Sequence, residues 1–134
     1  MPQNIYLAGK LNAGEVSIAA FADELEERGH TVLEKWWQLD RLPIPYLDHP
    51  SSSAPAAQAM IDAAYGSDVT ILFPGDTILG AAVELGAAIA SNRVRPEKHI
   101  IVVNPYEVRQ SVFYAHPAVV AVRSIAAVRS MHWY

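Results

Sequence analysis

The sequence has no cysteine among its 134 residues, which excludes disulfide bonds and thiolate metal ligands. Basic residues are also few: ten Lys and Arg stand against 14 Asp and Glu, and they form no basic run. Because binding to a nucleic-acid backbone relies on such basic patches, nucleic acid is not an expected partner. The five histidines have no metal-ligand spacing, so no metal site is predicted.

Long apolar runs are absent as well. No stretch is long enough to predict a membrane span, and the first residues show neither a basic region nor an apolar signal segment. A cytoplasmic protein without a membrane partner is therefore expected. The hydrophobic content of 51% and the charged content of 18% favour a folded chain over a disordered one. We expect one domain over residues 1–134.

Short apolar segments alternate with helical patterns along the chain. Helices are predicted at 16–28, with Gly29 as its C-terminal cap, at 54–65, with Pro55 in its first turn, and at 79–90. Strands are predicted at 4–8, 30–35, 68–74, 98–104 and 118–122. Such alternation predicts a five-stranded parallel sheet with helices on both faces.

Ligands of parallel α/β sheets bind beyond the carboxyl ends of the strands. That edge would gather the turn at 9–14, Trp36 and Trp37, the turn at 75–80, and Asn104. The first turn is either a ligand-binding loop or an ordinary strand-to-helix turn. The tryptophans either stack on a flat base or close the edge of the core.

The segment at 79–90 is the most unusual helix of the chain, because Glu84 is its only charged residue. An ordinary surface helix has a broad polar stripe, so this one is expected to be covered by the sheet and by another chain. A homodimer or higher homo-oligomer follows from that pattern. A carboxylate in such surroundings is costly to desolvate, and we expect Glu84 to face a polar cleft rather than bulk water.

Several short motifs occur in a characteristic order. They are Ile5-Tyr6-Leu7-Ala8-Gly9, Gly29-His30-Thr31-Val32 followed by Trp36, Asp62 fourteen residues before Asp76, Leu79-Gly80-Ala81-Ala82-Val83-Glu84-Leu85-Gly86-Ala87-Ala88, and Ser111-Val112-Phe113-Tyr114-Ala115-His116-Pro117. Over most of its length the chain resembles the nucleoside 2-deoxyribosyltransferase superfamily, which includes the 2'-deoxynucleoside 5'-phosphate N-hydrolases.

The resemblance implies an oligomeric, flavodoxin-like (Rossmann-like) α/β fold without a cofactor, acting on a small nucleoside or nucleotide. It implies that Glu84 is a nucleophile that forms a covalent glycosyl intermediate. Asp62 would exchange a proton with the departing or arriving base, and Tyr6 would orient the nucleophile. A retaining glycosyl transfer requires this division of labour between an ionised carboxylate and a proton donor.

The same resemblance implies a set of substrate-binding residues. Gly9 and Lys10 would lie near the sugar or its 5' substituent, and Ser111 would reach that end from a neighbouring subunit. Tyr134, at the aromatic C-terminal end, would reach a neighbouring active site. The remaining candidates stand at the carboxyl edge of the sheet: Trp36, Asp76 and Gly80.

The chain also departs from the family pattern. Ile78 stands where transferases often have an acidic residue that holds the base, a role for which Asp76 is the alternative. The first loop has Lys10 but no arginine, unlike the phosphate-hydrolase branch. Transfer of the sugar to another base is therefore the preferred interpretation. Hydrolysis of a 5'-monophosphate and a non-catalytic nucleotide-binding or assembly module are the alternatives.

Overall fold

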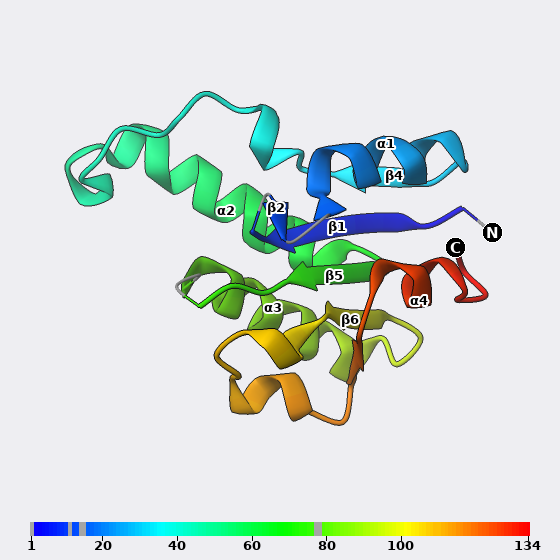
Figure 1. The fold of residues 1–134 in the computed structure, drawn as a ribbon. Coiled ribbons are helices and arrows are strands. Elements are labelled where there is room, and N and C mark those ends of the chain that lie inside the picture. The colour runs from blue at the N-terminus through cyan, green and yellow to red at the C-terminus, as the bar shows by residue number, and fades with distance from the viewer. Residues whose placement is uncertain (1, 11, 14–15, 77–78) are drawn as a thin grey trace.

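The computed structural model describes residues 2–10, 12–13, 16–76 and 79–134. Five parallel strands form one sheet in the order β4-β1-β5-β6-β7 (Figure 1). The strands are β1 (Asn4–Gly9), β4 (Thr31–Leu33), β5 (Val69–Phe73), β6 (His99–Val103) and β7 (Val119–Val122). This order, with the first strand between the second and the third, is that of flavodoxin-like proteins. The predicted fold class is confirmed.

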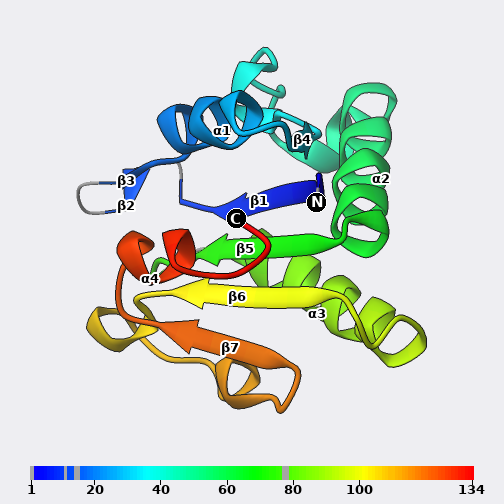
Figure 2. The same ribbon diagram turned by 90° about the vertical axis from the view of Figure 1, so that its right-hand side faces the viewer.

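Helices cover both faces of the sheet. On one face lie α1 (Ile18–Glu27) and α4 (Ile125–Arg129), and on the other lie α2 (Pro50–Gly66) and α3 (Leu79–Val94) (Figure 2). Successive side chains of β1 point to opposite faces, as a strand requires. Leu7 therefore joins the core under α1, whereas Tyr6 and Ala8 join the core under α2 and α3. All five residues of β5 are buried, which explains its uninterrupted apolar sequence.

Two predicted helix starts are wrong. The first helix begins at Ile18 rather than at residue 16, because Val16–Ser17 (β3) pairs with Asn12–Ala13 (β2) in a short antiparallel hairpin. The second helix begins at Pro50 rather than at residue 54, so Pro55 lies inside it and not in its first turn. Pro50 occupies the first turn, where a missing N–H costs nothing.

Other elements were not predicted. They are α4 and the 3₁₀ turns η1 (Trp36–Gln38), η2 (Tyr46–Asp48), η3 (Pro105–Glu107) and η4 (Val112–Ala115). Gly29 does follow the first helix, with a φ of 96°, as its predicted role as a cap requires. No helix among the described residues is long and apolar enough to cross a membrane.

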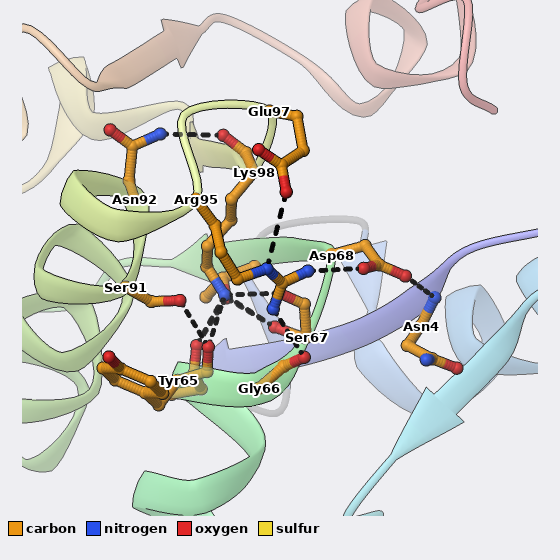
Figure 3. Close-up of polar contacts among 12 residues, drawn as sticks. Asn4, Tyr65, Gly66, Ser67, Asp68, Ser91, Asn92, Arg95, Glu97 and Lys98 are labelled. Carbon is orange, nitrogen blue, oxygen red and sulfur yellow. Dashed lines mark hydrogen bonds and ion pairs between the residues drawn. The ribbon is translucent and has the colours of Figure 1, made fainter.

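The amino edge of the sheet is closed by a polar network (Figure 3). The buried Lys98 ammonium donates to the carbonyl oxygens of Ala64 (2.8 Å) and Ser67 (2.6 Å), at the end of α2. Burial and the nearby Arg95 lower the pKa of Lys98 to about 8. Arg95 donates to Asp68 at 2.7 Å, and Asp68 accepts the backbone N–H of Asn4 at 2.9 Å. These contacts fix the starts of the strands. A ligand site is therefore sought at the opposite, carboxyl edge of the sheet.

Gly9 ends β1 in a conformation that only glycine tolerates well. Its φ is 109°, and a Cβ added there would lie 2.0 Å from the Phe73 carbonyl oxygen. That oxygen accepts the Lys10 N–H at 2.8 Å. A glycine is therefore required where β1 closes against β5, whatever its relation to a ligand.

We expect Gly9→Ala to lower the free energy of unfolding by about 3 kcal/mol, because the methyl group and the positive φ both oppose the native turn. Urea denaturation measures this. The matched control is Gly66→Ala at the end of α2, where an added Cβ meets nothing within 4 Å. That change should raise the free energy of unfolding by about 0.5–1 kcal/mol. Equal effects of the two substitutions would contradict the account of Gly9.

Candidate functional site

The side chains of Tyr6 and Glu84 lie next to each other between β1 and α3. Tyr6 comes from the middle of β1 and its side chain is fully buried, while Glu84 comes from the second turn of α3. Burial raises the pKa of Tyr6 above its usual range, and the Glu84 carboxylate raises it further. Burial also raises the pKa of Glu84, while the Tyr6 hydroxyl lowers it. The structure thus brings the two side chains together, while the expectation that Tyr6 orients a nucleophile stays a prediction.

Both groups have an unsatisfied polar atom. Tyr6 Oη and Glu84 Oε2 are buried, and neither reaches hydrogen-bond geometry with any described residue. The hydroxyl therefore acts on the carboxylate by proximity, without a formed hydrogen bond. An unsatisfied buried polar group costs about 1–3 kcal/mol, so such atoms are rare in folded proteins. Two further buried atoms among the described residues, His30 Nε2 and Trp133 Nε1, are also unpartnered. The Tyr6–Glu84 pair differs from them because it includes a carboxylate, which is costly to bury, and this marks it as a candidate site.

Trp36 bounds the same region. Its indole N–H donates to the Leu7 carbonyl oxygen at 2.8 Å, and its ring meets that of Trp37 edge to face at 5.4 Å. The half-buried side chain packs against both hydrophobic clusters. The sequence allowed two interpretations of the tryptophans, stacking on a base or closing the edge of the core. The contacts of Trp36 agree with the second, and its indole N–H is already used in the hydrogen bond to Leu7.

Glu34 was missed by the sequence reasoning. It follows β4 with a φ of 44°, a left-handed conformation that is uncommon for a residue other than glycine. Its carboxylate is close enough to Tyr6 to raise the pKa of that hydroxyl. No sequence signal indicates a positive φ at a glutamate, so this residue could be found only in the structure.

Asp62 is exposed on α2. Its helix packs against α3, but no hydrogen bond or ion pair joins the Asp62 carboxylate to another described residue. Within one chain, therefore, the structure brings Tyr6 and Glu84 together but leaves Asp62 outside their buried contact. Ile78 and part of the first loop (residues 11, 14 and 15) lie outside the described residues.

A cleft among the described residues lies on the other face of the sheet. It has a volume of about 750 Å³ and opens between α1 and α4 at the carboxyl ends of β1, β5, β6 and β7. Lys10, Asp76, Asn104 and Arg123 are among its polar lining residues, whereas neither Tyr6 nor Glu84 belongs to the described lining. The candidates Lys10 and Asp76 are thus grouped with this cleft and not with Glu84.

Asp76 also has a structural partner. Its Oδ1 atom accepts the backbone N–H of Arg109 at 2.6 Å, which ties the turn after β5 to the segment after β6. Asp76 thus fixes the end of β5 within the chain, and its role in holding a base stays a prediction.

Tyr134 docks on its own chain. Its hydroxyl donates to Glu24, its carbonyl oxygen accepts from Arg28 at 3.0 Å, and the Arg28 guanidinium lies 3.9 Å from its ring centroid. Arg129 binds the same Glu24 carboxylate with two hydrogen bonds and holds the pKa of that carboxyl below its usual range. The structure thus places Tyr134 against α1 of its own chain. The sequence resemblance implied instead that Tyr134 reaches the active site of a neighbouring subunit.

Ser111 and Gly80 lie apart from each other. Ser111 caps η4 by accepting the Phe113 N–H at 3.3 Å, and it lines a hollow of about 210 Å³ beside β7. Gly80 is exposed in the first turn of α3, where a Cβ would contact nothing within 4 Å. Among the described residues, no hydrogen bond joins Ser111 to Glu84.

Comparison of the sequence with models of known protein families finds no match, and comparison with curated proteins finds none either. Among the described residues, no group of three His, Asp or Glu side chains is placed to hold a metal ion.

The half-buried Glu84 side chain, whose Oε2 atom is fully buried, has a testable consequence for stability. Since burial raises its folded-state pKa above the ordinary 4.5, its contribution to stability is full below that pH and is lost as the pH rises through the raised pKa. We expect Glu84→Gln to raise the free energy of unfolding at pH 7 but not at pH 4.

Denaturation at both pH values measures the difference, with Glu27→Gln on the exposed end of α1 as the control that should show none. A Glu84→Gln variant that is equally destabilised at both pH values would contradict a buried, charged Glu84.

Proposed function

We propose that this protein cleaves the N-glycosidic bond of a nucleoside or nucleotide, with Glu84 as the nucleophile. The observation that carries the proposal is the pair of buried, unpartnered atoms, Tyr6 Oη and Glu84 Oε2, between the middle of β1 and the second turn of α3. A substrate hydroxyl or a reacting carbon placed there would use polar atoms that the chain itself leaves unsatisfied.

In the proposed reaction a Glu84 oxygen attacks the anomeric carbon, and the bond between that carbon and the base nitrogen breaks with its electron pair on the base. The departing base takes up a proton from Asp62 or from water, so the products are a glycosyl ester on Glu84 and the free base. With substrate bound, the Tyr6 hydroxyl would donate to the Glu84 oxygen that does not attack, closing the hydrogen bond that is unformed in the free chain. A second base or water then attacks the same carbon, gives up a proton to Asp62 or to water, and releases Glu84 as a carboxylate.

Transfer to a second base is our preferred outcome, and hydrolysis is the alternative. The first loop offers Lys10 as a cation, but Lys10 lines the cleft on the far face of the sheet from Tyr6, together with Arg123 and Arg129. A 5'-phosphate held beside Glu84 would therefore lie apart from these three cations. This favours a nucleoside over a nucleotide as the substrate.

A second copy of the chain is part of the proposal. The inner face of α3 is buried through Ala81, Leu85 and Ala88, while its outer face exposes apolar side chains: Leu79 (84%), Val83 (62%) and Val94 (68%). At Gly80 and Gly86 on this helix, an added Cβ would contact none of the described residues. Close approach of another subunit would explain these glycines. It would also cover the apolar face of α3 and enclose the Glu84 site.

The cleft supports a different candidate function. Its volume is within the range of small-molecule sites, about 300–1,000 Å³. Because Glu84 does not line it, a ligand bound there would not meet the proposed nucleophile. A binding module without catalysis is the function that this observation favours.

Chromatography of free base from a panel of nucleosides and their 5'-monophosphates, with and without a second base, tests the proposal. Glu84→Gln should reduce base release by about 10³-fold or more. Tyr6→Phe should reduce it by about 10- to 100-fold, since a hydrogen bond to a charged group is worth about 1.5–3 kcal/mol.

The control Glu27→Gln changes an exposed carboxylate on α1 and should leave the rate unchanged. A new nucleoside in the presence of the second base identifies transfer, and free base alone identifies hydrolysis. Ligand binding without base release, unaffected by Glu84→Gln, would support the binding module instead.

A further inference from the structure

Residues 130–134, hereafter the C-terminal segment, dock on the amino edge of the sheet. From the end of α4 the segment runs toward the amino ends of the strands (Figure 2). Its hydrogen bonds along the backbone are local: the Met131 N–H donates to the Val128 carbonyl oxygen and the Tyr134 N–H to that of Met131, both at 3.1 Å. Trp133, which is 4% exposed, belongs to the core under α1. Side-chain contacts therefore hold the segment against the sheet.

Two histidines from distant parts of the chain pack against Trp133. His30, which precedes β4, meets the indole edge to face, with ring centroids 5.9 Å apart. His99, the first residue of β6, lies 6.5 Å from the indole with an angle of 29° between the ring planes. The same ring meets His132 of the segment at 5.5 Å. Three imidazole rings thus surround this one docking contact.

The docked arrangement holds His30 in its neutral form. Its Nδ1 atom accepts the backbone N–H of Gln3 at 3.1 Å, so Nδ1 has a free lone pair and the ring proton is on Nε2. Nε2 is buried, and it forms no hydrogen bond with a described residue. A second proton on Nδ1 would face the Gln3 donor and would create a buried cation. Protonation of His30 is therefore incompatible with these contacts.

The surroundings of both packed histidines oppose a positive charge. Burial lowers the pKa of His30; the Tyr134 carbonyl oxygen raises it, whereas Arg28 at the end of α1 and the amino group of the chain lower it. Burial also lowers the pKa of His99, and the neighbouring His132 lowers it further.

The acids of this region are already paired. The Asp68 carbonyl oxygen accepts the His99 N–H at 3.0 Å, but the Asp68 carboxylate accepts from Arg95. Glu24 accepts from Arg129 and from the hydroxyl of the segment's last residue. In the part of the chain that the structure describes, no ion pair joins a carboxylate to either packed histidine. A proton on either ring would thus add a positive charge that nothing compensates.

We propose that the C-terminal segment is a pH-dependent switch, docked while His30 and His99 are neutral and released when these rings are protonated. This inference does not depend on the proposed function. Release would break the contact of the segment with Glu24, a residue that lines the cleft between α1 and α4 together with Arg129. The switch therefore connects pH to the wall of that cleft.

The direction of the effect follows from the lowered pKa of each ring. The docked state binds fewer protons than the released state, so docking is strongest above the ordinary histidine value of 6.5. It weakens as the pH falls below 6.5 toward the lowered pKa.

Hydrogen–deuterium exchange of the peptide 130–134 at pH 7.5 and pH 5, corrected for intrinsic exchange, measures release. Protection should fall by about tenfold or more at pH 5. A ring that cannot be protonated when docked lowers the docking equilibrium by up to about 30-fold there. Peptides from β5, whose residues are all buried, should keep their protection, which distinguishes release from unfolding of the sheet.

The double variant His30→Asn, His99→Phe removes both titrating rings. Asparagine retains an acceptor for the Gln3 N–H, and phenylalanine retains a ring against Trp133. The variant should reduce the pH effect to less than about threefold. His49→Gln, which replaces an exposed histidine at the start of α2, is the matched control and should retain the full effect.

Titration of the wild-type imidazole resonances by NMR is a second readout that requires no variant. Protonation of the two rings should coincide with loss of protection of the segment. Rings that titrate while the segment stays protected would overturn the switch, even if the double variant does not fold. Equal protection at both pH values, an undiminished pH effect in a folded double variant, or simultaneous loss of β5 protection would also overturn it.

Discussion

The burial of the Glu84 carboxylate against the Tyr6 hydroxyl is the interaction on which the proposed function depends. A carboxylate in a closely packed helix segment that is otherwise uncharged raises the free energy of the folded state, and here neither Glu84 Oε2 nor Tyr6 Oη has a partner among the described residues. The rest of the fold makes this arrangement tolerable. Two hydrophobic clusters, one on each face of the sheet, hold β1 and α3 in place on either side of the unsatisfied atoms.

The two edges of the sheet have different roles. At the amino edge, Lys98, Arg95 and Asp68 satisfy the carbonyl oxygens and N–H groups of the strand starts and of the end of α2 (Figure 3). Buried Trp133 packs against His30 and His99 at the same edge. Two buried atoms at this edge, His30 Nε2 and Trp133 Nε1, have no partner among the described residues. On the carboxyl side a cleft opens on one face of the sheet, and Tyr6 and Glu84 meet on the other face. The candidate site is therefore singled out by its buried carboxylate oxygen, and not by unpaired atoms alone.

Much of the fold could be predicted because buried strands and helices have a regular spacing of apolar residues in the sequence. The five strands are short apolar segments, and the lone charge between residues 79 and 90 is enough to single out Glu84. Tyr6 could not be derived from periodicity, since a tyrosine in a buried strand is ordinary, and it was proposed only through the resemblance to a family. The starts of α1 and α2 were wrong because a small hairpin and a proline in the first helical turn compete with the simpler pattern.

The remaining features depend on contacts between distant segments. The positive φ of Glu34 is fixed by hydrogen bonds from Trp36, and the position of Tyr134 is fixed by Glu24 and Arg28. No local pattern encodes either arrangement. The separation of Lys10 and Asp76 from Glu84 is likewise a property of the two faces of the sheet, which residues at one edge cannot reveal by their order in the chain.

Mass spectrometry of the protein after acid quench during turnover tests the central claim most directly. A glycosyl adduct is expected on the peptide that contains Glu84, because the proposed reaction passes through an ester of that carboxylate. The adduct should be absent from Glu84→Gln. Base release by the wild type without any adduct, or an adduct on another carboxylate such as Asp62, would contradict the assignment of Glu84 as the nucleophile.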